Sequence, residues 1–130
     1  MDKVHKVLIV DDFESTRAFI RYILVDAGFQ ATVVSTGNKA LDEMDDQMFD
    51  LIITDINLPD MDGFEFISEI QANERFRNTP IMVVSMDITK KSQQRGEAVG
   101  VSKWFSKPIS PSKLIDYIKA MTLSQFENDF

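Results

Sequence analysis

Short apolar runs alternate along the chain with segments that have helical spacing. Five runs of four or five residues, rich in β-branched side chains, are short and continuous enough to be strands buried on both faces. They lie at Val7–Val10, Thr32–Ser35, Leu51–Thr54, Ile81–Ser85 and, with a weaker pattern, Lys103–Ser106. The pattern therefore predicts five strands with helices between them.

The first helical segment carries apolar side chains at intervals of three and four residues, which is typical of an amphipathic helix. Gly28 follows as a stop signal. We expect the buried stripe of this helix to consist of Thr16, Phe19, Ile20, Ile23, Leu24 and Ala27.

Three further helices are expected between the later strands. The first begins at Thr36, and the second begins after Asp62. The third has a weaker pattern and extends from about Thr89 to about Val99. The inward-facing residues of the first two are expected to be Ala40, Leu41, Met44 and Met48, then Phe66, Ile67 and Ile70.

The final helix has the clearest start signal. Ser110 can cap free N–H groups, and Pro111 fits the first helical position. Leu114, Ile115, Ile118 and Met121 would face the core. We expect one domain over residues 1–122, with residues 123–130 as a short tail, because 130 residues fold around a single core.

Strict alternation of strands and helices favours the α/β class, in which helices cover both faces of a parallel sheet. Ligands of such sheets bind outside the carboxyl ends of the strands. The chemistry is therefore sought where each strand ends.

Composition narrows the class of protein. The chain has 14 basic and 21 acidic residues, a formal net charge of −7, which argues against nucleic-acid binding. It contains no cysteine and has no apolar run of the length that spans a membrane. A cytoplasmic protein that does not insert into membranes is the expected class.

Polar residues follow or end four of the five predicted strands. Asp11 and Asp12 follow the first, Asp55 the third, Ser85 ends the fourth, and Lys107 follows the fifth. Carboxylates brought together repel one another unless a cation compensates, and a hard divalent ion such as Mg²⁺ prefers oxygen ligands. The sequence therefore predicts a magnesium site at this edge.

Asp55 with a cation, a lysine and a hydroxyl nearby has what phosphoryl transfer requires: a nucleophile, positive charge and a hydrogen-bond donor. Each residue alone would be read as a cap, a turn or a solvated side chain. It is the combination that indicates the chemistry.

These residues resemble the response-regulator receiver family in order and spacing. The resemblance rests on Asp11–Asp12, Asp55, the run Leu58–Pro59–Asp60–Met61–Asp62–Gly63, Ser85 and Lys107–Pro108, and it covers almost the whole chain. It implies a flavodoxin-like, doubly wound (βα)₅ fold with strand order 2-1-3-4-5.

The resemblance also implies residue roles. Asp55 would be the phosphoacceptor, and Mg²⁺ would be held by Asp12, Asp55 and the backbone carbonyl of Asn57, with Asp11 acting directly or through water. Lys107 would pair with the phosphoryl oxygens, and Ser85 would hydrogen-bond the phosphoryl group. The switch residues would be Ser85 and Trp104.

Two residues depart from the commonest family pattern. Met86 stands where a small residue is usual, so it would narrow access to the phosphoryl group. Trp104 is larger than the more frequent Tyr or Phe, which places a wide rotation of this side chain in doubt, and a fixed surface aromatic is the alternative.

The resemblance further implies partners. A sensor histidine kinase or a histidine phosphotransfer protein would supply the phosphoryl group to a single-domain regulator of chemotaxis or phosphorelay type. A separate protein effector would read a changed surface that includes Ile88–Ala98, Trp104 and part of the last helix. A monomer is expected, with a dimer through this face as the alternative, and no enzymatic activity beyond self-phosphorylation and autodephosphorylation.

Three other functions are alternatives. A haloacid-dehalogenase-like phosphatase would need an acid two residues after the nucleophile, where this chain has Asn57. A nucleotide-binding flavodoxin-like module would need a Gly-rich loop after the first strand. A pseudo-receiver that binds partners without phosphorylation normally lacks an acid or the lysine, and all of these are present here.

Overall fold

Five parallel strands form one sheet in the order β2-β1-β3-β4-β5. The computed structural model describes the backbone of residues 5–128 and the side chains of residues 5–121. The strands are β1 (Lys6–Val10), β2 (Gln30–Val34), β3 (Leu51–Thr54), β4 (Ile81–Ser85) and β5 (Lys103–Ser106). The helices are α1 (Glu14–Asp26), α2 (Gly37–Asp46), α3 (Gly63–Ala72), α4 (Lys90–Ala98) and α5 (Pro111–Asn128). The predicted class and strand order are confirmed.

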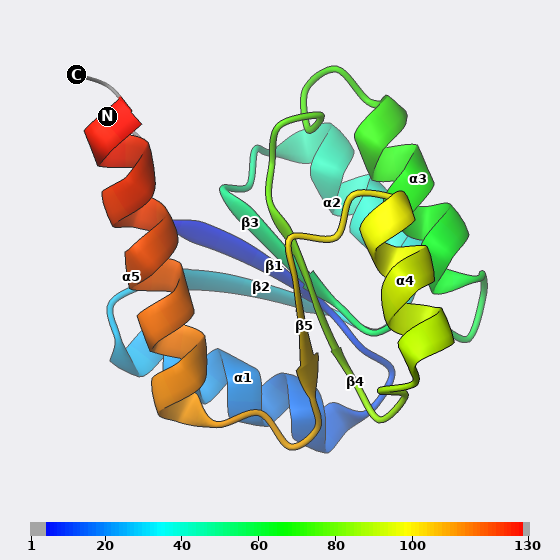
Figure 1. Ribbon diagram of the computed structural model, residues 1–130, viewed down its shortest axis with the longest axis horizontal. Coiled ribbons are helices and arrows are strands. Elements are labelled where there is room, and N and C mark those ends of the chain that lie inside the picture. Colours follow the sequence, from blue (N-terminus) through cyan, green and yellow to red (C-terminus); the bar gives the residue numbers. More distant parts are fainter. Residues whose placement is uncertain (1–4, 129–130) are drawn as a thin grey trace.

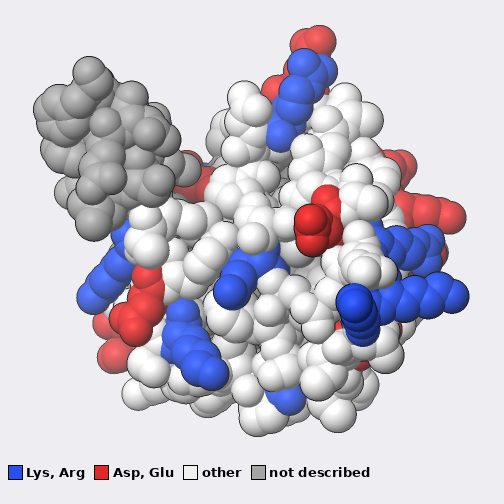
Figure 2. Space-filling model, viewed as in Figure 1, with Lys and Arg blue, Asp and Glu red and all other residues white. Residues whose placement is uncertain are grey.

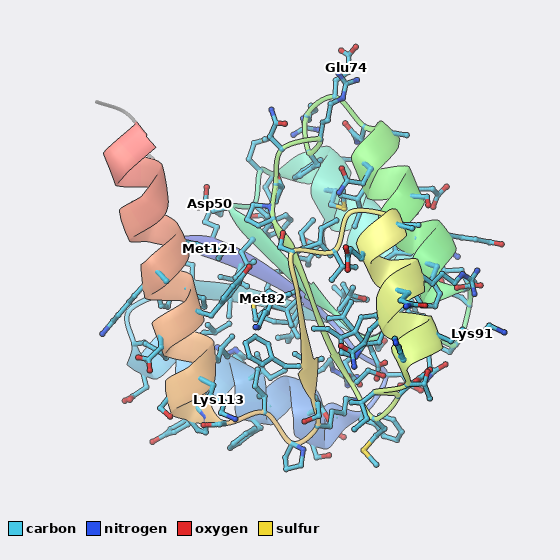
Figure 3. The ribbon with its side chains drawn as sticks, in the orientation of Figure 1. Asp50, Glu74, Met82, Lys91, Lys113 and Met121 are labelled. Carbon is cyan, nitrogen blue, oxygen red and sulfur yellow. The ribbon has the colours of Figure 1, made fainter. Side chains whose placement is uncertain are left out.

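Helices cover both faces of the sheet, with α1 and α5 on one face and α2, α3 and α4 on the other (Figure 1). Each face has its own core. Under α1 and α5 the core includes Val7, Ile9, Ile20, Leu24, Ile53, Met82, Leu114 and Ile118. Met121 of α5 packs against this core, of which Met82 of β4 is a member (Figure 3). Under the other three helices it includes Leu8, Ala40, Met44, Ile52, Phe66, Ile67, Ile70 and Val83.

The predicted helix starts are confirmed by cap hydrogen bonds. Thr36 Oγ1 accepts from the Lys39 N–H at 3.1 Å, and Asp62 Oδ1 accepts from the Phe64 N–H at 2.8 Å. Thr89 Oγ1 accepts from the Ser92 N–H at 3.2 Å. Gly28 follows α1 with a φ of +95°, a conformation that glycine adopts without strain.

Some residues predicted to be inward are exposed. Phe19 is 43% exposed and Ala27 is also exposed, because α1 contacts the sheet through Ile20, Ile23 and Leu24. Met48 is exposed because α2 ends at Asp46, before the helical stripe would have reached it. Helical spacing marks the edge of a buried stripe less well than its centre.

The last helix continues past the predicted boundary at Thr122. Its backbone is helical to Asn128, and no Gly or Pro lies between these two residues to stop it. The expected tail at residues 123–128 is therefore part of α5, and residues 129–130 lie outside the described range. No helix in the described range is both long enough and apolar enough to cross a lipid bilayer.

Candidate functional site

Strand pairing brings Asp11 and Asp55 together. Val10 and Thr54 are register partners in β1 and β3, so the next residue of each strand lies at the same edge of the sheet. The Asp55 N–H donates to the Val10 carbonyl oxygen at 3.0 Å. Both acidic residues are buried, at 2% and 3% exposure.

The Lys107 ammonium lies between these two carboxylates. Its Nζ is 2.8 Å from Asp11 Oδ2 and 2.7 Å from Asp55 Oδ2. The Lys107 N–H donates to the carbonyl oxygen of Ser85 at 3.0 Å, which fixes the loop after β5 beside the end of β4. Three groups from three strand ends therefore meet as predicted.

The cluster holds two carboxylates for one ammonium. Burial raises the pKa of Asp11, and the contact with Lys107 and the N–H of Phe13 only partly oppose this shift. Burial alone would lower the pKa of Lys107, but its contacts with Asp11 and Asp55 outweigh burial and raise that pKa. Lys107 therefore stays protonated at neutral pH.

Backbone contacts orient the Asp55 carboxylate. Its Oδ1 accepts from the N–H of Ile56 at 2.6 Å and from the N–H of Asn57 at 3.3 Å. Its Oδ2 faces Lys107 instead. In the residue before it, Thr54 Oγ1 donates to the Asp55 carbonyl oxygen at 2.7 Å. One carboxylate oxygen is thus held by the backbone, while the other faces the cation.

Asp12 lies apart from this pair. Its side chain is exposed and lines a groove with Asn57, Asp62 and Asp87. Within the described residues no three acidic or imidazole side chains are arranged to hold one ion. The expected cluster of three carboxylates is therefore not assembled, because the neighbouring Asp11 and Asp12 face different surroundings. The oxygen donors at this edge nevertheless fit a hard divalent ion, since two buried carboxylates share a single ammonium.

Ser85 is fully buried at the end of β4. Its Oγ accepts from the N–H of Asp87 at 3.1 Å. The Asp87 carboxylate in turn accepts from the Thr89 N–H and hydroxyl and from the Ser92 hydroxyl. The loop between β4 and α4 therefore links Ser85 to the first turn of α4.

Trp104 is half-buried and packed on several sides. Its Nε1 donates to the Asp87 carbonyl oxygen at 2.9 Å. Its ring stacks on Phe64, with centroids 6.3 Å apart and an interplanar angle of 27°. Gly96 of α4 lies so close that a Cβ built there would be 2.7 Å from the six-membered ring. Trp104 is therefore packed against α4 and held by a hydrogen bond, and both the switch role and the alternative of a fixed surface aromatic stay predictions.

The comparison with protein families agrees with this arrangement. The family model of the response regulator receiver domain matches residues 7–119. The chain belongs to this family. Receiver domains accept phosphoryl groups from histidine kinases and act as regulators.

Individual relatives differ in length. The chemotaxis protein CheY of Pseudomonas aeruginosa is 31% identical over 115 residues, which are 88% of this chain and 93% of that protein. The sensor histidine kinase CheAY of Helicobacter pylori is 33% identical over 115 residues. This chain spans only 14% of CheAY and 17% of the sensory/regulatory protein RpfC of Xanthomonas campestris, which is 27% identical.

Solved receivers have the same fold. CheY4 of Vibrio cholerae has a TM-score of 0.84 and 34% identity, over 91% of this chain and 98% of that one. The receiver domain of sensor histidine kinase PA1611 of Pseudomonas aeruginosa has a TM-score of 0.82 and 25% identity, over 90% and 96% of the two chains. That structure has a magnesium ion coordinated in its active-site cleft.

Sequence reasoning missed two side-chain contacts that shape this receiver. Asp60, in the loop after β3, accepts from the N–H groups of Gly37 and Asn38 at 2.9 and 2.8 Å, so it caps α2. Arg95 of α4 lies 3.3 Å from Asp62 and 4.2 Å from the centre of the Phe64 ring. Neither contact has a local sequence signal, because the partners are more than 20 positions apart.

Proposed function

We propose that this chain accepts a phosphoryl group on Asp55 with the help of Mg²⁺ and thereby signals to a protein partner. The observation that carries the proposal is the 2.7 Å contact between Asp55 Oδ2 and the Lys107 ammonium, with the Asp11 carboxylate on the other side. A nucleophilic oxygen and a cation for phosphoryl charge thus face each other in a buried site.

In this reaction an Asp55 carboxylate oxygen attacks the phosphorus of a phosphohistidine. The new O–P bond forms as the N–P bond breaks, and the histidine of the donor leaves. The Lys107 ammonium turns from the carboxylate of Asp55 to an oxygen of the phosphoryl group. The Ile56 and Asn57 N–H groups keep Asp55 oriented during attack.

The residues suited to hold Mg²⁺ are Asp11, Asp12, Asp55 and the backbone carbonyl of Asn57. When bound, the ion supplies positive charge that offsets the phosphoryl oxygens. Asp12 is the exposed member of this set and borders the groove that also reaches Asn57. Its side chain is therefore free to turn toward an ion, while Asp11 and Asp55 are already fixed by Lys107.

The switch would begin at Ser85. A phosphoryl group adds about two negative charges, and the Ser85 hydroxyl can donate a hydrogen bond to it. Ser85 Oγ also holds the Asp87 N–H, and the Asp87 carbonyl holds Trp104. A shift of Ser85 would therefore reach α4 and β5 through two hydrogen bonds.

The surface that changes would be the face formed by α4, β5 and α5, seen from the front in Figure 2, with basic side chains over α4 on one side and over α5 on the other. Lys90, Lys91 and Arg95 are exposed on α4, and Lys113 and Lys119 on α5. The phosphodonor would be a sensor histidine kinase or a histidine phosphotransfer protein. A cytoplasmic, monomeric regulator with a separate protein effector fits this arrangement.

The test is phosphorylation with acetyl phosphate in the presence and absence of Mg²⁺, followed by intact mass. The wild type should gain one phosphoryl group only with Mg²⁺, and Asp55→Asn should gain none. Asp50→Asn is the matched control, because Asp50 precedes the other end of the same strand and accepts only from the backbone of His5 and Lys6 in the contacts described. Absence of a mass gain in the wild type would overturn the proposal and favour a pseudo-receiver.

A further inference from the structure

Phe13 is an exposed aromatic residue at the edge of the phosphoacceptor site. It directly follows the Asp11–Asp12 pair and precedes the first turn of α1. Its side chain is 57% exposed. Of the two cores described above, neither includes Phe13. Packing of the fold therefore gives no reason for a phenylalanine at this position.

The ring of Phe13 lies against the Lys107 ammonium. Lys107 Nζ is 4.7 Å from the ring centre, within the range of a cation–π contact. The side chain of Lys107 is only 9% exposed. The side of the ammonium that does not face the two carboxylates is thus screened in part by an aromatic face.

The backbone of Phe13 contacts the same cluster. Its N–H donates to Asp11 Oδ1 at 2.9 Å, while Asp11 Oδ2 contacts Lys107. One residue therefore holds Asp11 through its backbone and Lys107 through its ring. A side-chain substitution removes only the second of these contacts, because the N–H remains.

We propose that Phe13 is a positioning residue for phosphoryl transfer, whose ring keeps the Lys107 ammonium at the site while its carboxylate partner changes. This inference rests on the proposed function. Before transfer, Lys107 is held by Asp11 and Asp55. Once Asp55 is an acyl phosphate, its carboxyl group no longer carries the charge of the ion pair. The attraction of the ring for the ammonium is the same before and after.

The aromatic character of position 13 is therefore the property to test. Leucine retains an apolar side chain but has no aromatic quadrupole, whereas tyrosine retains the ring face. Both substitutions are at an exposed position outside the cores, so the fold should tolerate them. Phe19→Leu is the matched control, because Phe19 is an exposed phenylalanine that lines, together with Phe13, an apolar groove beside Lys107.

The first measurement is the initial rate of phosphorylation by acetyl phosphate at saturating Mg²⁺. Phe13→Leu should be slower by about three- to tenfold, as expected for loss of one cation–π contact. Phe13→Tyr and Phe19→Leu should react at close to the wild-type rate. The affinity for Mg²⁺, followed by Trp104 fluorescence, should be the same in all variants, since Phe13 supplies no oxygen ligand.

The second measurement needs neither metal nor phosphodonor. The side-chain ammonium signal of Lys107 in a proton–nitrogen NMR spectrum should weaken in Phe13→Leu through faster exchange with water, and should persist in Phe13→Tyr. Equal rates and equal ammonium signals in wild type and Phe13→Leu would overturn the role of Phe13 alone. An equal loss of rate in Phe13→Tyr or Phe19→Leu would also overturn it. An unreactive wild type would instead overturn the proposed function itself.

Discussion

The indole Nε1 of Trp104 and the carbonyl oxygen of Asp87 are joined by a 2.9 Å hydrogen bond. This bond connects β5 to the loop that follows Ser85, and the Asp87 N–H of that loop donates to Ser85 Oγ. The opposite side of the indole packs on α4 at Gly96. Trp104 therefore contacts both this loop and α4, in addition to the hydrogen bond between Asp87 and the Ser92 hydroxyl.

Gly96→Ala should displace the Trp104 ring. The added methyl group would lie 2.7 Å from the six-membered ring and 3.3 Å from a Val101 methyl, so the indole has to shift outward. We expect Trp104 emission to move to longer wavelength and acrylamide quenching to increase. An emission spectrum identical to that of the wild type would contradict this packing.

The same substitution offers an internal control. Alanine favours an α-helix over glycine by about 1 kcal/mol. In a Trp104→Phe background the smaller ring leaves room for the methyl group, so Gly96→Ala should there raise the free energy of unfolding. A loss of stability in both backgrounds would place the clash somewhere other than at Trp104.

Asp11→Asn should stabilise the protein at neutral pH. Burial raises the pKa of Asp11 in the folded protein above its value in the unfolded chain. The contribution of Asp11 to stability is therefore greatest below the pKa of the unfolded state, and it is lost as the pH rises through the pKa of the folded state. Asparagine removes this loss and leaves one ammonium paired with one carboxylate. We expect a gain on the order of 1 kcal/mol in urea unfolding at pH 7, shrinking toward about pH 4. Asp42→Asn, at an exposed position of α2, is the control and should show little change.

Lys107→Met should have the opposite effect. It leaves the buried carboxylates of Asp11 and Asp55 without their cation, which typically costs about 3 kcal/mol or more. The loss should be largest at neutral pH and smaller in acid, because burial raises the pKa of Asp11 and protonation of this residue removes one of the two unpaired charges. Adding Asp11→Asn to this variant should recover part of the lost stability. Equal losses at pH 4 and pH 7 would rule out the electrostatic cause.

Asp87→Ala should loosen the first turn of α4. Hydrogen bonds from the Ser92 hydroxyl and from the N–H and hydroxyl of Thr89 lower the pKa of Asp87. These hydrogen bonds therefore stabilise the folded protein at a pH above the pKa of Asp87 in the unfolded state. Their contribution is lost as the pH falls through the pKa of Asp87 in the folded state. We expect faster amide hydrogen exchange in α4 at neutral pH, with exchange in α2 unchanged. Protection of α4 equal to that of the wild type would contradict this stabilising role of Asp87.

The sequence allowed the sheet and the strand-end residues to be predicted because both depend on local patterns. The apolar runs at Leu51–Thr54 and Ile81–Ser85 matched β3 and β4 residue for residue. Parallel pairing then fixed which end of the sheet would hold Asp11, Asp55 and Lys107. Spacing along the chain was sufficient for this part of the site.

Side-chain direction and contacts between distant residues could not be predicted in the same way. Asp11 and Asp12 are adjacent, yet one faces Lys107 and the other lines an open groove. Side chains of successive residues in an extended backbone point in opposite directions. Asp11 and Asp12 can therefore bind the same metal ion only if the backbone turns locally, and the residue types do not specify such a turn. The contact of Asp62 with Arg95 spans 33 positions and depends on the packing of two helices.

The hydrogen bonds of Asp60 make the two sides of the Asp55 site unequal. Both of its carboxylate oxygens hold backbone N–H groups at the start of α2, and these hydrogen bonds lower its pKa despite the opposing effect of burial. The loop after Asp55 is thus tied to a helix that packs on β1 and β2. On the other side, α4 buries only its glycine and relies on exposed polar contacts. If Asp55 is phosphorylated as proposed, we therefore expect a larger displacement on the α4 side of the site than on the α2 side.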